Sequence, residues 1–355
     1  MNISARFLIN RGDFSLDIDL DINAKGIISI YGPSGSGKTT LLRTLAGLEK
    51  GDNGYIQIGN QIWQDKTNYI STHKRAVGFV TQESSLFPHL NVKKNIEYGF
   101  KRIHNREKNI SVNQIVSLLE INHLLERNPK NLSGGEKQKV AIAQAIALNP
   151  NLLLLDEPLS ALDESNKKEI FPYLKLINKN LNLPVIYVTH DRNEIIALTD
   201  IIILLDHGKI KATGQIKDLF SSLELSFAHE KDALTIIEAD VIENDKSYGL
   251  TILKFKGGRF IINSKPLQVG TKVRLQVFAR DISITLQKQR DTSILNILPV
   301  IIDDLSVEND SVVTIRLMAN ETPLLARLTR KSVEELNLKP KDKVFAQVKT
   351  IALLA

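Results

Sequence analysis

Apolar and polar residues alternate over the first part of the chain, and an uninterrupted apolar run at residues 27–30 follows. The alternating apolar positions are Phe14, Leu16, Ile18 and Leu20. Alternation predicts antiparallel strands with one buried face, and a continuous apolar run predicts a strand that is buried on both faces. Residues 1–31 are therefore predicted to form antiparallel strands that lead into one buried strand.

From residue 32 to about 222, helical and strand patterns alternate, which is typical of a layered α/β domain with a largely parallel sheet. Three runs in this region are rich in Leu or β-branched residues and end on a polar group, namely Ala76–Thr81, Leu152–Asp156 and Val185–Thr189. Open α/β sheets bind ligands at the carboxyl ends of their strands, so we expect functional groups there. The segment 91–131 has a helical pattern, and a helical subdomain is predicted over about 91–150.

The pattern changes after about residue 230, where short strands are separated by Gly, Asn-Asp and Pro signals. This spacing predicts an all-β module of barrel or sandwich type, joined to the first domain by a linker near 222–234. The predicted strands include Tyr248–Phe255, Arg259–Asn263, Lys272–Ala279, Val312–Met318 and Val344–Ile351.

Composition narrows the class of protein. The 355 residues include no cysteine, which excludes a disulfide framework and thiolate chemistry. The longest apolar stretches, Leu152–Leu155 and Ile201–Leu205, are far shorter than the roughly 20 residues that a membrane helix needs, and the N-terminus has no signal-peptide core. The formal net charge of +6 is compatible with nucleic acid or an anionic membrane surface, but a solvated Lys-rich exterior is the favoured explanation.

Residues 32–40 match the phosphate-loop pattern, in which two glycines with four residues between them precede Lys and Thr. The loop lies between a predicted strand at Gly26–Tyr31 and a predicted helix at Thr39–Leu48, which is the context that the motif requires. Its backbone N–H groups would close on phosphates, Lys38 would neutralise the β- and γ-phosphates, and the Thr39 hydroxyl would contact Mg²⁺. The predicted nucleotide-binding residues here are Gly32, Pro33, Ser34, Gly35, Ser36, Gly37, Lys38, Thr39 and Thr40.

A second glycine turn, Leu132-Ser133-Gly134-Gly135-Glu136, opens a predicted helix that runs from Lys137 to Leu148. It places free N–H groups and the positive end of a helix dipole where an anion can bind. Ser133, Gly134 and Gly135 are therefore predicted to contact phosphate. Two chains facing each other would enclose ATP between the phosphate loop of one chain and the second turn of the other.

Polar residues at the strand ends supply candidate chemistry. Asp156 ends a buried strand and is placed to hold Mg²⁺ together with Thr39, and Glu157 beside it can polarise an attacking water. His190 follows another buried strand, where it can contact the γ-phosphate and orient that water. Gln82 follows a third strand and is predicted to bridge Mg²⁺, the water and a mobile segment. The predicted catalytic residues are Glu157, His190 and Gln82, and the predicted Mg²⁺ ligands are Thr39, Gln82 and Asp156.

These motifs, in this order, resemble those of the ATP-binding cassette (ABC) ATPases over roughly residues 1–230. The resemblance implies an α/β fold: an ABC-type phosphate-loop nucleotide-binding domain with a helical subdomain. It also implies a signature at Leu132–Gln138, a D-loop at 160–163 and an aromatic residue that stacks on adenine. Phe14 is the candidate for that aromatic, with hydrophobic core as its competing role. Lys139 and Gln144 stand where many members of the family have Arg.

The C-terminal part is similar to the small oxyanion-binding Mop domain of molybdate proteins, a TOBE-type module, at 291–298 and 326–332. Ser, Thr, Lys and backbone N–H groups suit a tetrahedral oxyanion, which accepts hydrogen bonds and donates few. The predicted oxyanion-binding residues are Thr292, Ser293 and Lys349. The predicted domains are an ABC ATPase domain at 1–230, an OB-like β segment at 231–290 and a Mop-like domain at 291–355. A dimerising β-barrel that binds no anion is the alternative.

From end to end the chain resembles the ATP-binding subunits of molybdate importers. That resemblance implies ATP and Mg²⁺ as cofactors, and a homodimer that sandwiches two ATP molecules and drives two copies of a membrane permease subunit. It also implies a periplasmic oxyanion-binding protein as partner, regulation by molybdate or tungstate, and a peripheral position on the cytoplasmic face of the inner (plasma) membrane. The permease would contact the segment after Gln82, especially Leu86–Phe87.

Other readings remain open. The substrate could be sulfate or a sugar, because the cassette does not contact the substrate. A soluble ABC ATPase that acts on nucleic acid is disfavoured, and no nucleic acid partner is expected, since the chain has one cassette and no sustained heptads. A non-catalytic oxyanion storage protein is disfavoured by the presence of Lys38, Glu157 and His190.

Overall fold

The computed structural model describes residues 1–83, 85–101 and 110–354. The chain divides into two compact units, Met1–Gly214 (unit 1) and Gln215–Ala355 (unit 2). The division lies before residue 230 and before the predicted linker at 222–234. Residues 215–220 belong to unit 2 because helix α7 (Ile216–Phe220) packs against strand β11 (Leu234–Asp245) of that unit.

Unit 1 is built on a ten-stranded sheet with the order β5-β4-β1-β2-β10-β9-β3-β8-β7-β6. Its strands are β1 (Asn2–Arg11), β2 (Phe14–Asn23), β3 (Ile27–Tyr31), β4 (Asp52–Ile58), β5 (Gln61–Gln64), β6 (Val77–Val80), β7 (Leu152–Asp156), β8 (Val185–Thr189), β9 (Ile201–Asp206) and β10 (Lys209–Gln215). The first strands pair antiparallel, whereas β6, β7, β8, β3 and β9 are parallel neighbours. The predicted antiparallel start and parallel centre are both confirmed.

The helices of unit 1 cover both faces of the parallel strands. They are α1 (Lys38–Ala46), α2 (Val92–Phe100), α3 (Val112–Leu118), α4 (Gly134–Ile146), α5 (Glu164–Leu181) and α6 (Arg192–Leu198), with short 3-10 turns at Thr72–Lys74, Asn122–Leu124 and Pro129–Asn131. Successive residues of a strand point to opposite faces. Accordingly Leu152 and Leu154 of β7 share a core cluster with α1, and Leu153 and Leu155 share another with α4 and α5.

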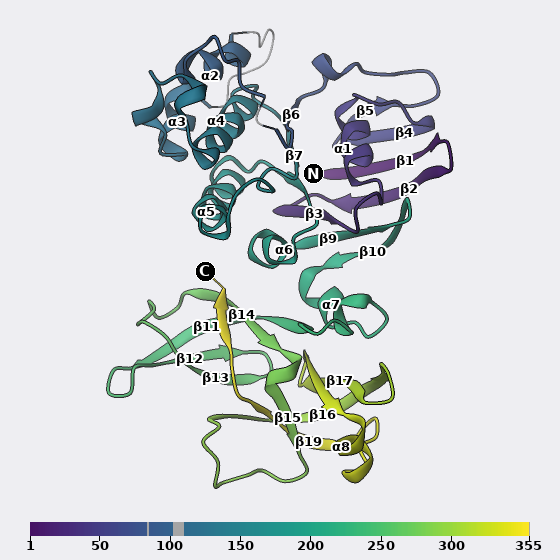
Figure 1. The fold of residues 1–355 in the computed structure, drawn as a ribbon, viewed down its shortest axis with the longest axis vertical. Coiled ribbons are helices and arrows are strands. Elements are labelled where there is room, and N and C mark those ends of the chain that lie inside the picture. The colour runs from purple at the N-terminus through teal and green to yellow at the C-terminus, as the bar shows by residue number, and fades with distance from the viewer. Residues whose placement is uncertain (84, 102–109, 355) are drawn as a thin grey trace. The chain divides into compact units, whose positions relative to one another are not determined.

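Helices α2, α3 and α4 lie together beside the sheet and form the predicted helical subdomain (Figure 1). Residues 102–109 of the predicted range 91–150 lie outside the described residues. The described helices include none that is both long and apolar enough to cross a membrane.

Unit 2 consists of two five-stranded sheets with the orders β13-β12-β11-β14-β20 and β15-β19-β16-β17-β18. The strands not yet given are β12 (Leu250–Phe255), β13 (Gly258–Asn263), β14 (Lys272–Phe278), β15 (Ile282–Thr285), β16 (Asn296–Val307), β17 (Val312–Ala319), β18 (Thr322–Thr329), β19 (Lys343–Val348) and β20 (Ala352–Leu354). Helix α8 (Arg330–Glu335) and 3-10 turns at Ser226–Ala228 and Ala279–Asp281 complete the unit. The predicted all-β module is confirmed.

The two sheets of unit 2 share one hydrophobic core. The same cluster contains Leu253 and Phe260 from the first sheet and Ile302 and Ile315 from the second. Strand β20, at the end of the chain, pairs with β14 and so adds to the first sheet. The segments 231–290 and 291–355, predicted as separate pieces, therefore form a single compact body.

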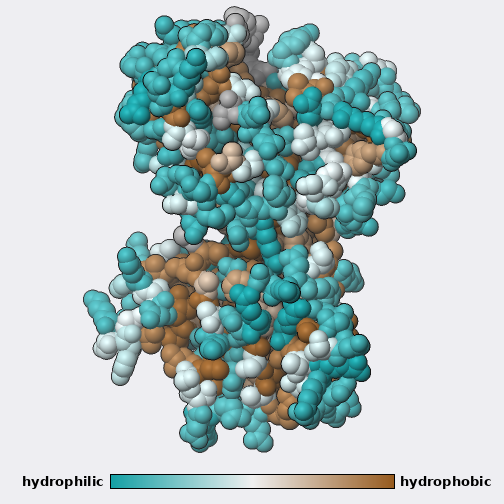
Figure 2. Space-filling model, in the orientation of Figure 1, coloured by the Kyte–Doolittle hydropathy of each residue, from teal (hydrophilic) through white to brown (hydrophobic). Residues whose placement is uncertain are grey.

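The surfaces of the two units differ in apolar exposure. Among the described residues, the large apolar side chains that are more than half exposed all belong to unit 2: Tyr248, Val269, Leu286, Leu295 and Val307. On the face shown in Figure 2, hydrophobic residues are more prominent over unit 2 than over unit 1.

Candidate nucleotide-binding and catalytic site

The predicted phosphate loop connects β3 to α1, as the motif requires. Gly35 and Gly37 have positive φ values of 79° and 102°, a conformation that glycine adopts without strain. A Cβ at Gly32 would lie 1.9 Å from the carbonyl oxygen of Leu205. The loop can therefore fold tightly enough to turn its backbone N–H groups inward only because these positions lack side chains.

Lys38 and Ser36 place buried polar groups in the loop, and only those of Lys38 have hydrogen-bond partners there. Lys38 is 5% exposed, and its Nζ donates to the carbonyl oxygens of Gly32 and Pro33, each at 2.8 Å. Burial lowers the pKa of Lys38, although the nearby carboxylates Glu157 and Asp156 oppose this effect. The buried Oγ of Ser36 has no hydrogen-bond partner in the described chain. A bound phosphate would supply acceptors for both residues, so this loop fits ATP.

Thr39 and Asp156 meet where α1 begins and β7 ends. The Thr39 hydroxyl donates to Asp156 Oδ1 at 3.0 Å. Burial raises the pKa of Asp156, and the hydrogen bond from Thr39 opposes this effect. A hydroxyl and a partly desolvated carboxylate are oxygen ligands of the kind that Mg²⁺ prefers, so the pair fits the predicted metal.

Gln82, the third predicted Mg²⁺ ligand, lies at the same edge of the sheet. It is exposed and follows β6, whose Val80 pairs in parallel register with Leu155 of β7. Among the described residues, no hydrogen bond joins Gln82 to Thr39 or Asp156. Its part in metal binding and catalysis stays a prediction.

Glu157 and His190 are brought together from two neighbouring strands. His190 Nδ1 lies 3.1 Å from Glu157 Oε1. Glu157 has a φ of 44°, a left-handed conformation that costs a non-glycine residue about 1–3 kcal/mol. Its backbone N–H donates to the carbonyl of Val188 on β8 at 3.0 Å, which holds the turn in place. The strained turn directs the carboxylate toward His190 rather than along the strand.

The signature turn caps its own helix. Ser133 Oγ accepts from the Glu136 N–H at 3.2 Å, and a Glu136 carboxylate oxygen accepts from the Ser133 N–H at 2.7 Å. A Cβ at Gly134 would lie 2.9 Å from Leu162 of the D-loop, whereas one at Gly135 would meet nothing within 4 Å. The turn therefore rests on the D-loop on one side and is open on the other, which leaves room for a phosphate from a second chain.

Phe14 lies next to the phosphate loop. A Cβ at Gly37 would be 3.0 Å from the tip of the Phe14 ring. The ring is half-buried and packs against the core cluster that contains α1. The position is compatible with both roles considered for Phe14, so adenine stacking stays a prediction.

Asn95 is a residue that sequence analysis missed. It is fully buried on α2, and its Nδ2 donates to the carbonyls of Phe87, Leu90 and Asn91 at 3.0–3.1 Å. Its Oδ1 accepts from the Phe87 N–H at 2.8 Å. One side chain thus fixes the segment predicted to contact the permease. The feature of the sequence that could have identified Asn95 is a polar residue on the apolar face of a predicted helix, between Val92 and Ile96.

The candidate oxyanion residues gather at one end of the second sheet of unit 2. Asn296 of β16 pairs with Val348 of β19, so the segment before β16, which contains Thr292 and Ser293, and Lys349 after β19 leave the sheet at the same end. The Thr292 hydroxyl accepts from the Ile294 N–H at 3.2 Å. Ser293 and Lys349 are exposed. Their role in binding an anion stays a prediction.

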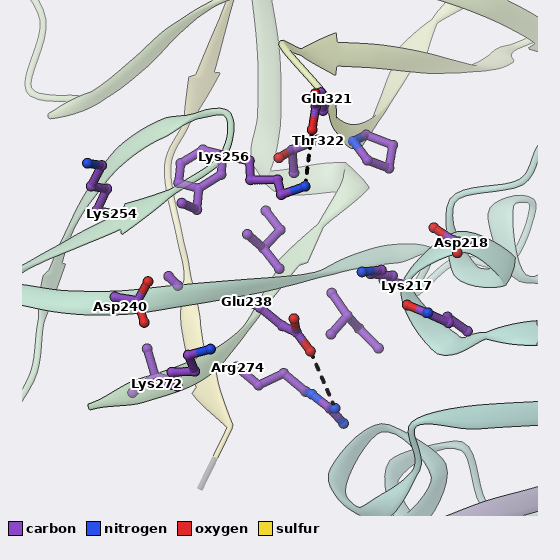
Figure 3. A pocket seen from close by; sticks show the side chains of 17 residues that line it. Lys217, Asp218, Glu238, Asp240, Lys254, Lys256, Lys272, Arg274, Glu321 and Thr322 are labelled. Atoms are coloured by element: carbon purple, nitrogen blue, oxygen red, sulfur yellow. Dashed lines mark hydrogen bonds and ion pairs between the residues drawn. The ribbon is translucent and has the colours of Figure 1, made fainter. Parts of the chain in front are cut away.

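A charged groove of about 1020 Å³ lies elsewhere in unit 2, along β11, β12, β14 and α7 (Figure 3). Five basic and four acidic side chains line it, and two ion pairs join them. Arg274 lies 4.0 Å from Glu238, and Lys256 lies 3.1 Å from Glu321. The predicted oxyanion residues do not line this groove.

Comparison with known families supports the organisation of both units. The family model for ABC transporters matches residues 16–160, and the model for the TOBE domain matches residues 292–354. The predicted TOBE-type module is therefore confirmed.

The chain is similar over nearly its full length to curated proteins. It is 44% identical to the molybdenum import ATP-binding protein ModC 1 of Azotobacter vinelandii, over 99% of this chain and 98% of that protein. It is also 44% identical to the molybdenum import ATP-binding protein ModC of Aromatoleum aromaticum, over 99% of this chain and 94% of that protein.

Solved structures match the cassette. The dimeric post-hydrolysis structure of the ATP-binding cassette MJ0796, bound to ADP and Pi, has a TM-score of 0.52 and 28% identity, and the match covers 60% of this chain and 98% of that chain. The structure of cbiO1 from Clostridium perfringens, part of the ABC transporter complex cbiONQ, has a TM-score of 0.56 and 26% identity, over 62% of this chain and 91% of that chain.

Proposed function

The chain belongs to the ATP-binding cassette transporter family, and from this premise we propose that it is the ATP-hydrolysing subunit of a molybdate importer. One observation carries the catalytic part of the proposal. The buried Lys38, the Thr39–Asp156 pair and the Glu157–His190 pair all lie at the carboxyl ends of neighbouring parallel strands. The import of molybdate rests on the full-length relatives, which are named molybdenum import ATP-binding proteins. Tungstate is proposed as a second substrate because its anion is chemically similar.

The reaction follows from these positions. The phosphate loop and Lys38 bind the β- and γ-phosphates of ATP. Thr39 and Asp156 would hold Mg²⁺, which neutralises phosphate charge when bound. Glu157 accepts a proton from the water that attacks the γ-phosphorus, and the bond to the oxygen bridging the β- and γ-phosphates breaks to give ADP and phosphate. His190 orients the Glu157 carboxylate through their 3.1 Å contact.

Two copies of the chain act together in this proposal. The open side of Gly135 leaves space for the γ-phosphate of an ATP held by a second chain. The solved cassette MJ0796 is described as dimeric, which is compatible with this assembly. The closed dimer would drive two permease subunits through the segment Leu86–Phe87, whose shape Asn95 fixes.

The remaining partners follow from the importer class. A periplasmic oxyanion-binding protein would deliver the substrate, and this chain would lie peripherally on the cytoplasmic face of the inner membrane. Thr292, Ser293 and Lys349 would bind molybdate or tungstate and slow transport when the anion accumulates. A dimer contact without anion is the second candidate for unit 2, favoured by the exposed apolar side chains Leu295 and Val307.

The catalytic part is tested by Glu157→Gln. Loss of the general base is expected to slow ATP hydrolysis by about 10²- to 10⁴-fold while ATP binding persists. The variant should accumulate as an ATP-bound dimer in size-exclusion chromatography. Glu169→Gln, on the exposed side of α5, is the control and should keep normal turnover. Normal hydrolysis by Glu157→Gln would contradict the assignment.

The anion site is tested by calorimetric titration with molybdate and tungstate, with sulfate and phosphate as comparisons. Tight binding of the first two that is lost in Ser293→Ala and Lys349→Ala would support both the substrate class and a regulatory site. If no anion binds, unit 2 is left with the dimer contact, and the substrate must be assigned through the periplasmic protein.

A further inference from the structure

A buried lysine that the proposed reaction does not use lies on α5. Lys167 is 8% exposed, and its Nζ lies 2.5 Å from Asp191 Oδ2, 2.9 Å from Glu194 Oε1 and 3.4 Å from Glu164 Oε1. A buried charge is costly unless it is paired. Burial acts to lower the pKa of Lys167, but the hydrogen bonds to Asp191 and Glu194 outweigh it, so the pKa is raised.

The partners of Lys167 surround His190 in the chain. Asp191 follows His190 directly, caps α6 by accepting from the Asn193 N–H at 2.8 Å, and donates its own N–H to Thr189 Oγ1 at 3.0 Å. Glu194 is 2% exposed and accepts from the hydroxyls of Tyr187 and Thr189, both at 2.7 Å. The chain on either side of His190 is therefore tied into one buried network.

The other end of the network leads back to Glu157. Lys167 lies one turn into α5, whose start is capped by Asp163, which accepts from the Asn166 N–H at 2.9 Å. Before α5, the Ser160 hydroxyl donates to the carbonyl of Glu157 at 3.0 Å. Lys167 thus links the segment that follows Glu157 to the segment that contains His190.

We propose that Lys167 is a positioning residue for ATP hydrolysis, whose ion pairs with Asp191 and Glu194 hold His190 against Glu157. The proposal rests on the proposed ATPase function. Lys167 itself pairs with Asp191, Glu194 and Glu164 and acts on the reaction through His190. Without its charge, two carboxylates would face each other in a buried place, and the start of α6 would move away to hydrate them.

The first experiment compares Lys167→Met with Lys167→Arg in the full chain. A displaced His190 is expected to lower kcat by about tenfold to 100-fold in the Met variant. KM for ATP should stay unchanged, because Lys38 and Thr39 lie on a different helix. Lys167→Arg keeps the charge and should restore most of the turnover. Lys168→Met changes the exposed neighbour and serves as the matched control. An unchanged kcat in Lys167→Met would overturn the proposal.

A double-mutant cycle separates positioning from a purely structural role. If Lys167 acts through His190, adding Lys167→Met to His190→Ala should cost less than about twofold in kcat. Independent, multiplicative losses would overturn the proposal. Where Lys167→Met does not fold, the triple variant Lys167→Met, Asp191→Asn, Glu194→Gln removes the unpaired charges. A lowered kcat in that variant supports the proposal, and a normal kcat overturns it.

The two proposals fail in different ways. If the unmodified protein does not hydrolyse ATP, the proposed function fails and this inference fails with it. If the protein hydrolyses ATP and Glu157→Gln abolishes turnover, but Lys167→Met keeps a normal kcat, only the role of Lys167 is overturned.

Discussion

Two buried polar side chains of the phosphate site in unit 1 differ in their bonding from two in unit 2. In unit 1, the Ser36 hydroxyl has no partner in the described chain, and burial raises the pKa of Asp156. In unit 2, Glu308 is paired with Arg327 at 2.6 Å, and Asn296 bonds both the N–H and the carbonyl of Ile261 at 2.7 and 2.9 Å. Ser36 and Asp156 are thus available to a ligand, whereas the bonds of Glu308 and Asn296 hold strands of unit 2 together.

The two candidate sites therefore differ in how far their side chains are already in contact: the phosphate site of unit 1 has such contacts, and, among the described residues, the oxyanion site of unit 2 does not. In unit 1, Lys38 and Asp156 are buried, Thr39 donates to Asp156, and the exposed His190 already contacts Glu157. The candidate oxyanion residues of unit 2 include exposed side chains at the end of a sheet. Substitutions in unit 1 should therefore change ligand binding more than folding, and substitutions in the polar network of unit 2 should do the reverse.

The largest expected effect is the loss of nucleotide affinity in Lys38→Ala. Each charge-assisted hydrogen bond to phosphate is worth about 1.5–3 kcal/mol, so the dissociation constant for ATP should rise by about 100-fold. Titration with a fluorescent ATP analogue measures this change. Lys25→Ala, at an exposed position of the same unit, should bind normally. Tight ATP binding by Lys38→Ala would contradict the phosphate-loop assignment and remove the contrast between the units.

Next in size is the destabilisation expected for Arg327→Met. The Glu308 side chain is 7% exposed, so removing Arg327 takes away its nearest cation and leaves the Thr314 hydroxyl and, at 3.8 Å, His229 Nδ1 as partners. Breaking such a pair costs about 3–5 kcal/mol, which urea unfolding would detect. ATP hydrolysis by the folded fraction should not change.

The control for this variant is Arg330→Met, which removes an exposed ion pair with Glu334 at 2.8 Å. Exposed pairs contribute about 0.2–1 kcal/mol to the free energy of unfolding, so the control should unfold at nearly the same urea concentration as the unmodified protein. Equal stability of the two variants would show that the Arg327–Glu308 pair does not hold unit 2 together.

The smallest expected effect concerns Asp156→Asn in the absence of nucleotide. Because burial raises the pKa of Asp156 above its ordinary value of 3.8, ionisation of this carboxyl destabilises the folded protein. The Asn variant should have a higher Tm at neutral pH, and its advantage should vanish as pH falls below 3.8. With added Mg²⁺ and ATP, the unmodified protein should have the higher Tm of the two, because only the carboxylate binds the metal well. A variant less stable than the unmodified protein at neutral pH would contradict this account.

Several elements were predictable because their signal is local. The runs at Leu152–Asp156 and Val185–Thr189 form β7 and β8 with the predicted bounds, since uninterrupted apolar runs of this length suit strands buried on both faces. Helix α4 begins at the predicted glycine turn, because Ser133 and Glu136 form a capping box that depends on spacing alone. The strands β11 and β16 were not predicted individually, and the shared core of unit 2 depends on how its two sheets pack.

The phosphate loop, the order of the motifs and the strand end at Asp156 and Glu157 could be predicted from the amino-acid sequence. These features depend on residues that are close together in the chain. Only the tertiary structure decided that His190 contacts Glu157, that Asn95 fixes the segment at Phe87 and that Lys167 pairs with Asp191 and Glu194. The reason is that spacing along the chain sets which face of an element a residue occupies, whereas packing between elements sets which distant residue it meets.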